Sequence, residues 1–268
     1  MSSGPEEPAE QRPARPEPGG AAESELVRRR RVHVEITLVR HGEPDWTPTG
    51  GPSVADPGLT RYGVAQARAS AIAIAKAGVD AIYVSPLTRA QETAEPLVES
   101  TGVAAITIDS LAEIDPGAHG MTRDQVDSYF VEAMRRPLDE HWDGWPEGES
   151  FRDFHRRVTA GAADLLERHG VRAAPMSDFT CWHVPDEPIS IVIVAHGGTN
   201  AVLLTHLLDI RPVPWEWIRF DSELASFSVV QARPIGPQGA VWSLQNFNEI
   251  DPLRAAGLRC ARSPGGPE

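Results

Sequence analysis

An apolar run rich in β-branched residues, residues 32 to 39, ends abruptly in Arg40-His41-Gly42. Such a run is typical of a buried strand, which normally ends in a loop at the edge of a sheet. Gly42 lets that loop turn tightly and lets a ligand approach the backbone. Arg40 offers a planar fork of donors that suits phosphate, and a neutral His41 is a nucleophile. Three residues alone are a weak signal that an ordinary surface loop also produces.

The same order of features recurs later in the chain. Residues 189 to 195 are its most apolar segment, and they run directly into His196-Gly197-Gly198. A helix is expected over residues 201 to 208, and the free backbone N–H groups at a helix start suit an anion. This second strand exit is therefore predicted to place an imidazole and several N–H donors beside an anionic ligand.

An arginine lies at a third strand exit. Residues 80 to 84 are predicted to form a strand that leads straight into a helix. Either Ser85 or Thr88 can cap this helix, and both alternatives place Arg89 in its first turn. A cation is mildly unfavourable at that end of a helix, which is expected where a residue serves a site rather than stability.

A carboxylate lies at a fourth exit, where Glu113 follows a short predicted strand over residues 104 to 108. A solvated surface carboxylate is the commoner role of such a residue. The apolar neighbours of Glu113 nevertheless favour a protonated carboxylic acid, the form that donates a proton in general acid catalysis.

Alternating predicted strands and helices indicate an α/β fold with a mostly parallel central sheet. Because the exits of parallel strands meet at one edge of an open sheet, the two histidines, two arginines and one glutamate are expected to converge there. The remaining segments are a helix from residue 60 to residue 78, a helix from 150 to 169, late strands over 224 to 231 and 241 to 246, a cap over 115 to 150, and an extra loop over 171 to 188.

Composition excludes several classes of function. A net charge of -13 argues against general binding to nucleic acid or to an anionic membrane, and no apolar stretch is long enough to span a bilayer. Two cysteines do not make a disulfide framework, so we expect reduced thiols and a cytoplasmic location. Residues 1 to 30 and 259 to 268 lack hydrophobic periodicity and are expected to be disordered tails around a single domain, residues 31 to 258.

Taken together, these residues resemble the histidine phosphatase superfamily, which includes the phosphoglycerate mutases. The matching segments span residues 33 to 230 in the family's order and are Leu38-Val-Arg-His-Gly-Glu43, Leu59-Thr60 with Gly63 and Gln66-Ala67, Ser85-Pro-Leu-Thr-Arg89 with Thr93-Ala94, Glu113, Gly148-Glu-Ser150 and Val194-Ala-His-Gly-Gly198. The resemblance implies a three-layer α/β/α sandwich with a cap formed by insertions.

The resemblance also implies a phosphomonoester hydrolase that acts on a small phosphorylated metabolite. His41 is then the phosphorylated nucleophile, and Glu113 protonates the leaving group and afterwards activates water. Arg40, Arg89 and His196 hold the phosphoryl oxygens, and the backbone at Gly197 lies beside them. No metal and no cofactor are expected, and the oligomeric state stays open, with a homodimer as one alternative.

Some positions depart from the family pattern. Thr47 stands where many members have an asparagine that contacts phosphate, so Thr47 is only a substitute candidate for that contact. In the mutase branch the acid glutamate is followed by Arg-His-Tyr-Gly, whereas Glu113 is followed by Ile114-Asp115-Pro116-Gly117, which resembles the phosphatase branch. His119 could face the substrate or the solvent.

The alternatives are a mutase, a non-catalytic phospholigand binder, and a metal hydrolase that uses His41, His196 and Glu113 as ligands. Arginines crowded into the same pocket argue against a bound dication. Arg123, Arg135 and Arg136 in the cap would allow a substrate with a second negative group.

The N-terminal tail is expected to be dispensable for catalysis, because its composition cannot bury a core. Removal of residues 1 to 26 should leave kcat and KM within about twofold of the full chain's values, which steady-state phosphatase assays of both proteins measure. A large loss of turnover in the shortened chain would mean that the tail takes part in the site.

Overall fold

The computed structural model describes residues 34–47, 54–118, 120–236 and 239–259, which lie within one compact unit that begins at Val32. The expected N-terminal tail, all but the first residue of the expected C-terminal tail, and His119 lie outside the described residues.

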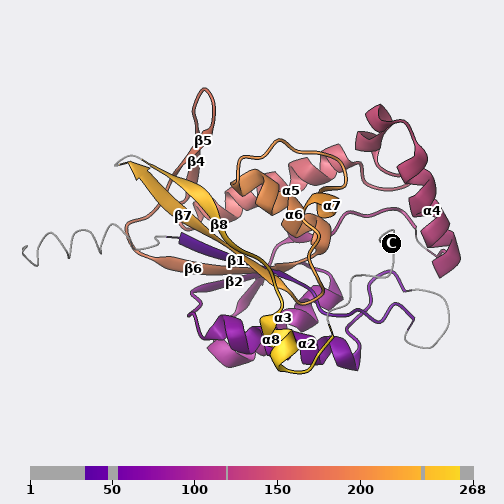
Figure 1. The fold of residues 1–268 in the computed structure, drawn as a ribbon, viewed down its shortest axis with the longest axis horizontal. Helices are drawn as coiled ribbons and strands as arrows, with labels where there is room; N and C mark the ends of the chain where they lie inside the picture. The colour runs from indigo at the N-terminus through magenta and orange to yellow at the C-terminus, as the bar shows by residue number, and fades with distance from the viewer. Residues whose placement is uncertain (1–33, 48–53, 119, 237–238, 260–268) are drawn as a thin grey trace, which may run out of the picture. The chain divides into compact units, whose positions relative to one another are not determined.

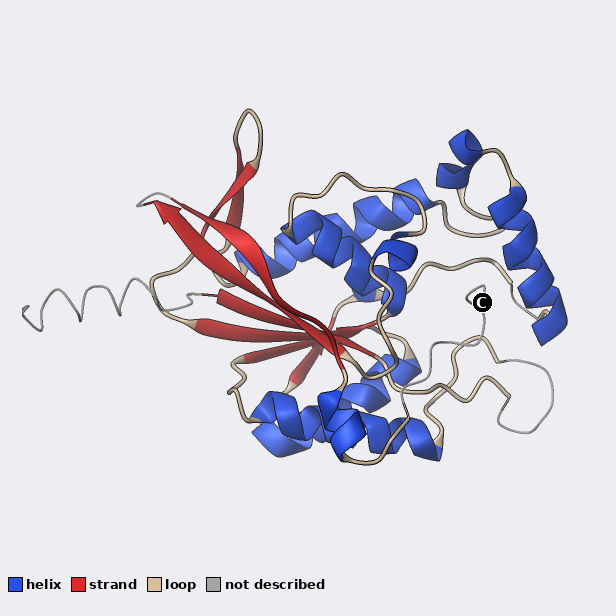
Figure 2. Ribbon diagram, viewed as in Figure 1, coloured by secondary structure: helices blue, strands red, loops and turns tan. Residues whose placement is uncertain are grey.

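An eight-stranded sheet runs through the middle of this unit, with helices on both sides (Figures 1 and 2). Its strands follow the order β3-β2-β6-β1-β7-β8-β5-β4. Their bounds are β1 Val34–Arg40, β2 Ala81–Val84, β3 Ala105–Thr107, β4 Arg172–Pro175, β5 Thr180–His183, β6 Ile189–Ala195, β7 Phe227–Gly236 and β8 Gly239–Glu249.

The sheet is mixed. Strands β3, β2, β6 and β1 pair parallel to one another, as the alternation of strands and helices predicts. The pairs β1–β7, β7–β8, β8–β5 and β5–β4 are antiparallel, so the expectation of a mostly parallel sheet is wrong for this half. The parallel half is the part that carries the predicted strand exits.

The segment over residues 171 to 188, which is predicted to be an extra loop, also differs from its prediction. It contains β4 and β5, which pair antiparallel and extend the sheet beyond β8. β4 is mostly exposed and lacks the alternation of apolar and polar residues that marks a half-buried strand. The sequence of β4 therefore carries no strand pattern. Trp182 of β5 is buried and packs against Trp242 of β8.

Helices cover both faces of the sheet. Helices α2 (Arg61–Ala75), α3 (Thr88–Thr101) and α8 (Asp251–Ala255) lie on one face, and α5 (Phe151–Glu167) and α6 (Gly197–Leu207) on the other (Figure 1). Alternate residues of the central strands supply the two cores: Leu38 and Ile193 pack toward α5 and α6, Val39 and Val194 toward α2 and α3. The expected three-layer α/β/α arrangement is confirmed.

The segment predicted as a cap contains α4 (Arg123–Arg135) and the 3-10 helix η2 (Leu138–Asp143), beyond another 3-10 turn, η1 (Asp109–Leu111). In Figure 1, α4 stands apart from the two helical layers, beyond the carboxyl ends of the central strands. A buried aromatic cluster ties the cap to the domain, since Trp145 packs against Phe151 of α5 and against Trp215, which precedes the short helix α7 (Glu216–Arg219). Among the described helices, none combines the length and apolar character that a bilayer crossing requires.

Candidate active site

The ends of three parallel strands lie level with one another. Arg40, the last residue of β1, is paired with Ala195, the last residue of β6, and Val84 at the end of β2 is paired with Val194. His41 follows the end of β1 and His196 follows the end of β6. The centroids of their rings lie 5.1 Å apart. The two histidines are therefore neighbours because of the sheet register.

His41 is held in one tautomer. Its Nδ1 lies 2.8 Å from the carbonyl oxygen of Gly42, which can only accept, so Nδ1 carries the proton and the lone pair is on Nε2. Burial, followed by the positive charges of Arg89 and Arg40, holds the pKa of His41 well below the ordinary value of 6.5. The imidazole is consequently neutral at physiological pH, the state that a nucleophile needs.

The loop that carries His41 is packed tightly against the start of α2. A Cβ atom on Gly42 would lie 2.7 Å from the carbonyl oxygen of Gly63, so only glycine fits there. The backbone N–H of Glu43 donates to Gln66 Oε1 at 2.9 Å, and Thr60 Oγ1 donates to the Glu43 carboxylate at 2.8 Å. Gln66 and Thr60, two of the residues that carry the family resemblance, thus help to fix the position of the loop that contains His41.

Arg40 and Arg89 bring two guanidiniums to His41, since both lower its pKa electrostatically. A guanidinium Nη1 of Arg40 donates to the carbonyl oxygen of Ser222. The Nε atoms of both arginines are buried and have no partner among the residues that the structure describes. Burial lowers the pKa of each guanidinium, yet arginine stays charged, so two positive charges lie near His41.

The start of α3 differs from both predicted caps. The helix begins at Thr88, and the carboxylate of Asp56 accepts from the Thr88 backbone N–H and hydroxyl at 2.9 and 2.7 Å. Asp56 also forms a 3.7 Å ion pair with Arg89, whose guanidinium lies 5.3 Å from the centre of the Trp46 ring. Thr47, the proposed phosphate contact, is exposed, and it is Trp46 that this loop places over Arg89.

His196 is oriented by Ser85. Its Nε2 lies 2.7 Å from Ser85 Oγ, and both residues are fully buried. The other ring nitrogen, Nδ1, is buried and has no hydrogen-bond partner within the described part of the chain. Burial, followed by the charge of Arg89, holds the pKa of His196 well below its usual value, so this second imidazole is also neutral.

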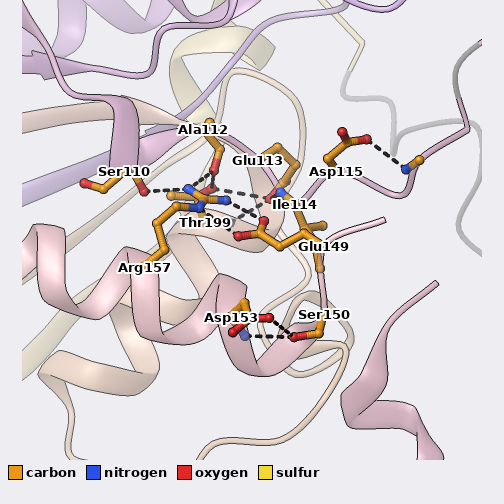
Figure 3. A network of polar contacts seen from close by, with 11 residues as sticks. Ser110, Ala112, Glu113, Ile114, Asp115, Glu149, Ser150, Asp153, Arg157 and Thr199 are labelled. Carbon is orange, nitrogen blue, oxygen red and sulfur yellow. Dashed lines mark hydrogen bonds and ion pairs between the residues drawn. The ribbon is translucent and has the colours of Figure 1, made fainter. Parts of the chain in front are cut away.

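The side chain of Glu113 lies beside Thr199 (Figure 3). Its carboxylate accepts hydrogen bonds from the backbone N–H groups of Gly198 and Thr199, at the start of α6, at 2.9 and 3.1 Å. The expectation that these N–H groups serve a ligand anion is therefore wrong for Gly198 and Thr199, because the anion is the protein's own carboxylate. The apolar surroundings expected for Glu113 are likewise replaced by N–H donors. The negative charge of Glu113 acts against the lowering of the pKa of Arg40 and of Arg89 by burial.

Glycine is required beside Glu113. A Cβ atom on Gly198 would lie 2.6 Å from Glu113 Oε1 and 3.1 Å from Trp217 Cε3. A Cβ atom on Gly197, the first residue of α6, would lie 3.4 Å from Cζ of Arg40, which is an ordinary van der Waals contact. The absence of a side chain on Gly198 is therefore what lets the helix start approach the carboxylate.

The cap arginines are placed differently from the site arginines. Arg136 donates a guanidinium N–H to the carbonyl oxygen of Gly144, so it is engaged with the cap's own backbone. Arg135 is exposed at the end of α4, and the side chain of Arg123 lies outside the described residues. Within the described ranges, no group of three or more His, Cys, Asp or Glu side chains is arranged to hold a metal ion.

Several contacts of the site have no signal in the sequence. The sequence marks Ser85 only as a possible helix cap, and nothing in it assigns a partner to Asp56 or to Thr199. The Thr199 hydroxyl donates to the Ala112 carbonyl oxygen at 3.1 Å. A pairwise contact across more than 80 residues of sequence, as between Glu113 and Thr199, follows only from the completed fold.

Comparison with known proteins decides the family. A profile described as the histidine phosphatase superfamily (branch 1) matches residues 36–245, most of the chain. The chain belongs to this superfamily. Both the resemblance inferred from the motifs and the enzyme class, a histidine-type phosphatase, are thereby confirmed at the level of the family.

Individual histidine phosphatase relatives are similar over most of their length. Phosphoserine phosphatase 1 of Hydrogenobacter thermophilus is 34% identical over 200 residues, which are 74% of this chain and 86% of that protein. A 2,3-bisphosphoglycerate-dependent phosphoglycerate mutase of Azorhizobium caulinodans is 36% identical over 134 residues, 46% of this chain and 64% of that one. The solved mycobacterial glucosyl-3-phosphoglycerate phosphatase is 27% identical, with a TM-score of 0.59 over 80% of this chain and 98% of that chain.

The position of His41 leads to a prediction about covalent labelling. Brief incubation with radiolabelled p-nitrophenyl phosphate, followed by denaturation without acid, should trap an alkali-stable, acid-labile phosphoprotein. Because the pKa of His41 is lowered, the imidazole stays neutral as the pH falls through 6.5, and kcat/KM should not decline down to about pH 6. The substitution His41→Ala should abolish labelling, and an unlabelled wild-type protein would contradict the assignment.

The position of Glu113 leads to a prediction about leaving groups. The substitution Glu113→Gln should reduce kcat/KM by about 100-fold or more for alkyl phosphates, whose leaving oxygen must be protonated. The loss should be much smaller for p-nitrophenyl phosphate, since nitrophenolate leaves without a proton. Equal losses across a series of leaving groups would move the role elsewhere, with Asp115 as the next carboxylate to test.

Proposed function

We propose that this protein hydrolyses phosphomonoesters through a phosphohistidine formed on His41. The observation that carries the proposal is the bond from Nδ1 of His41 to the Gly42 carbonyl, which leaves Nε2 as a neutral nucleophile between two buried guanidiniums. A phosphoryl dianion would balance the charges of Arg40 and Arg89, and Nδ1 of His196 would hold a third oxygen.

In the first half-reaction, Nε2 of His41 attacks phosphorus. The N–P bond forms as the bond from phosphorus to the ester oxygen breaks, and Glu113 gives its proton to that departing oxygen. The two guanidiniums stabilise the negative charge on the phosphoryl oxygens during the transfer. The alcohol product leaves with the proton, and Glu113 is left as a carboxylate.

In the second half-reaction, this carboxylate is the base. Glu113 takes a proton from a water molecule as the water oxygen attacks phosphorus and the N–P bond breaks. Inorganic phosphate leaves, His41 returns to its neutral form, and Glu113 is protonated again. The N–H groups of Gly198 and Thr199 support the carboxylate stage of this cycle, because they donate to the charged form.

The substrate we propose is a small phosphorylated metabolite, and the cytoplasm is the location we propose for its hydrolysis. Relatives named as a phosphoserine phosphatase and a glucosyl-3-phosphoglycerate phosphatase support this class. The segment Ile114-Asp115-Pro116-Gly117 after the acid supplies no cation for a second acidic group, which favours hydrolysis over isomerisation. The engagement of Arg136 with Gly144 is consistent with the same preference.

Hydrolysis and isomerisation can be separated with one substrate pair. Offered 3-phosphoglycerate with a trace of 2,3-bisphosphoglycerate, the protein should form little 2-phosphoglycerate. A panel of other phosphomonoesters, followed by release of inorganic phosphate, should identify at least one that is hydrolysed. Rapid isomerisation with little phosphate release would overturn the proposal, and so would a panel with no turnover at all.

A further inference from the structure

Glu113 lies in a stretch without regular secondary structure, between the 3-10 turn η1 and the cap. A general acid must be held close to its productive position, and a loop supplies this only if it is anchored on both sides. The hydrogen bonds from α6 hold the carboxylate itself. A separate group of contacts holds the backbone around it.

Arg157, from the middle of α5, provides the anchor before Glu113 (Figure 3). Its Nη1 donates to the carbonyl oxygens of Ser110 and Ala112 at 2.9 and 3.1 Å. Ala112 immediately precedes Glu113, so the guanidinium binds the peptide group that joins Ala112 to Glu113.

Glu149 provides the anchor after Glu113. Its backbone N–H donates to the carbonyl oxygen of Asp115 at 2.7 Å. Its carboxylate accepts from Nε and Nη2 of Arg157 at 2.9 and 2.7 Å. Glu149 thus binds the segment after Glu113 through its backbone and binds Arg157 through its side chain.

These contacts close a ring around the acid. Going round it, Arg157 binds Ala112, the chain passes through Glu113 to Asp115, and Asp115 binds Glu149, which returns to Arg157. All three nitrogens of the guanidinium take part, in a bidentate pair with the carboxylate and a shared bond to two carbonyls. A lysine keeps the charge but cannot make this planar set of bonds.

We propose that Arg157 and Glu149 form a clasp that positions Glu113 for proton transfer. All three guanidinium nitrogens of Arg157 and both carboxylate oxygens of Glu149 are engaged in this ring, so both are positioning residues and act through the backbone of residues 110 to 115. The proposal rests on the proposed function, since it concerns the proton donor of that reaction. It predicts that loosening the clasp impairs protonation of the leaving group more than transfer of the phosphoryl group.

The test measures kcat/KM against the pKa of the leaving group for a series of aryl and alkyl phosphates. This parameter reports the steps up to phosphohistidine formation, in which the acid donates its proton. Arg157→Lys and Glu149→Gln should each lower kcat/KM about 10- to 100-fold for alkyl phosphates and less than about threefold for p-nitrophenyl phosphate. The slope of log kcat/KM against leaving-group pKa should therefore be steeper in both variants than in the wild type.

Arg156→Lys is the matched control, because Arg156 is the adjacent residue of α5, is exposed, and pairs only with Asp153 among the described residues. It should leave the slope unchanged. The double variant with Arg157→Lys and Glu149→Gln should lose little more than either single variant, because both break the same ring.

The possible outcomes distinguish a failure of this proposal from a failure of the proposed function on which it rests. A wild type that hydrolyses no phosphomonoester would overturn the proposed function. A hydrolytic wild type with clasp variants that lose activity equally for all leaving groups, or lose none, would overturn the clasp alone. If Arg157→Lys lowers the melting temperature too far for assay, the slope of Glu149→Gln decides, since this variant keeps the backbone bond to Asp115.

Discussion

The parallel pairing of β1 with β6 and of β6 with β2 is the constraint on which the site depends. Its register places Arg40 opposite Ala195 and Val84 opposite Val194, so three chain segments leave the sheet at one level. His41 and His196 are neighbours for that reason, although 154 residues separate them in the sequence. A slip of one residue in the β1–β6 pairing would turn the alternate side chains of one strand to the other face and separate the two imidazoles.

Burying two imidazoles beside two guanidiniums determines the charge state of the site. Desolvation and the positive charges lower the pKa of both histidines, so both are neutral while the arginines remain charged. The site therefore has two guanidinium charges near His41 and a free lone pair at Nε2 of that residue. The arrangement is unfavourable in acid, because the unfolded chain binds protons at the ordinary histidine pKa of 6.5 and the folded chain does not, so stability falls as the pH drops below that value.

The sequence predicts the parts of this structure whose causes are local. Apolar, β-branched runs and glycines mark the parallel strands and the residues that follow them, and the helices expected to begin at residues 60 and 150 are capped by the side chains of Thr60 and Ser150. Contacts between distant segments have no local cause. The carboxylate of Asp56 at the start of α3, and the hairpin of β4 and β5 with its exposed first strand, belong to this second kind. Such features depend on tertiary neighbours, which a single sequence does not reveal.

The cap leaves the domain and returns to it at a single point. Cβ atoms on Gly117 and Gly148 would clash with the backbone at Glu147 and Asp115, so the two stems touch along their main chains. The intervening segment can change length at little cost in free energy, since doubling a loop whose ends already meet costs only about 0.6 kcal/mol. Insertions and deletions here would leave the sheet register untouched. Evolution can therefore vary the cap while the strand ends that carry His41 and His196 stay in place.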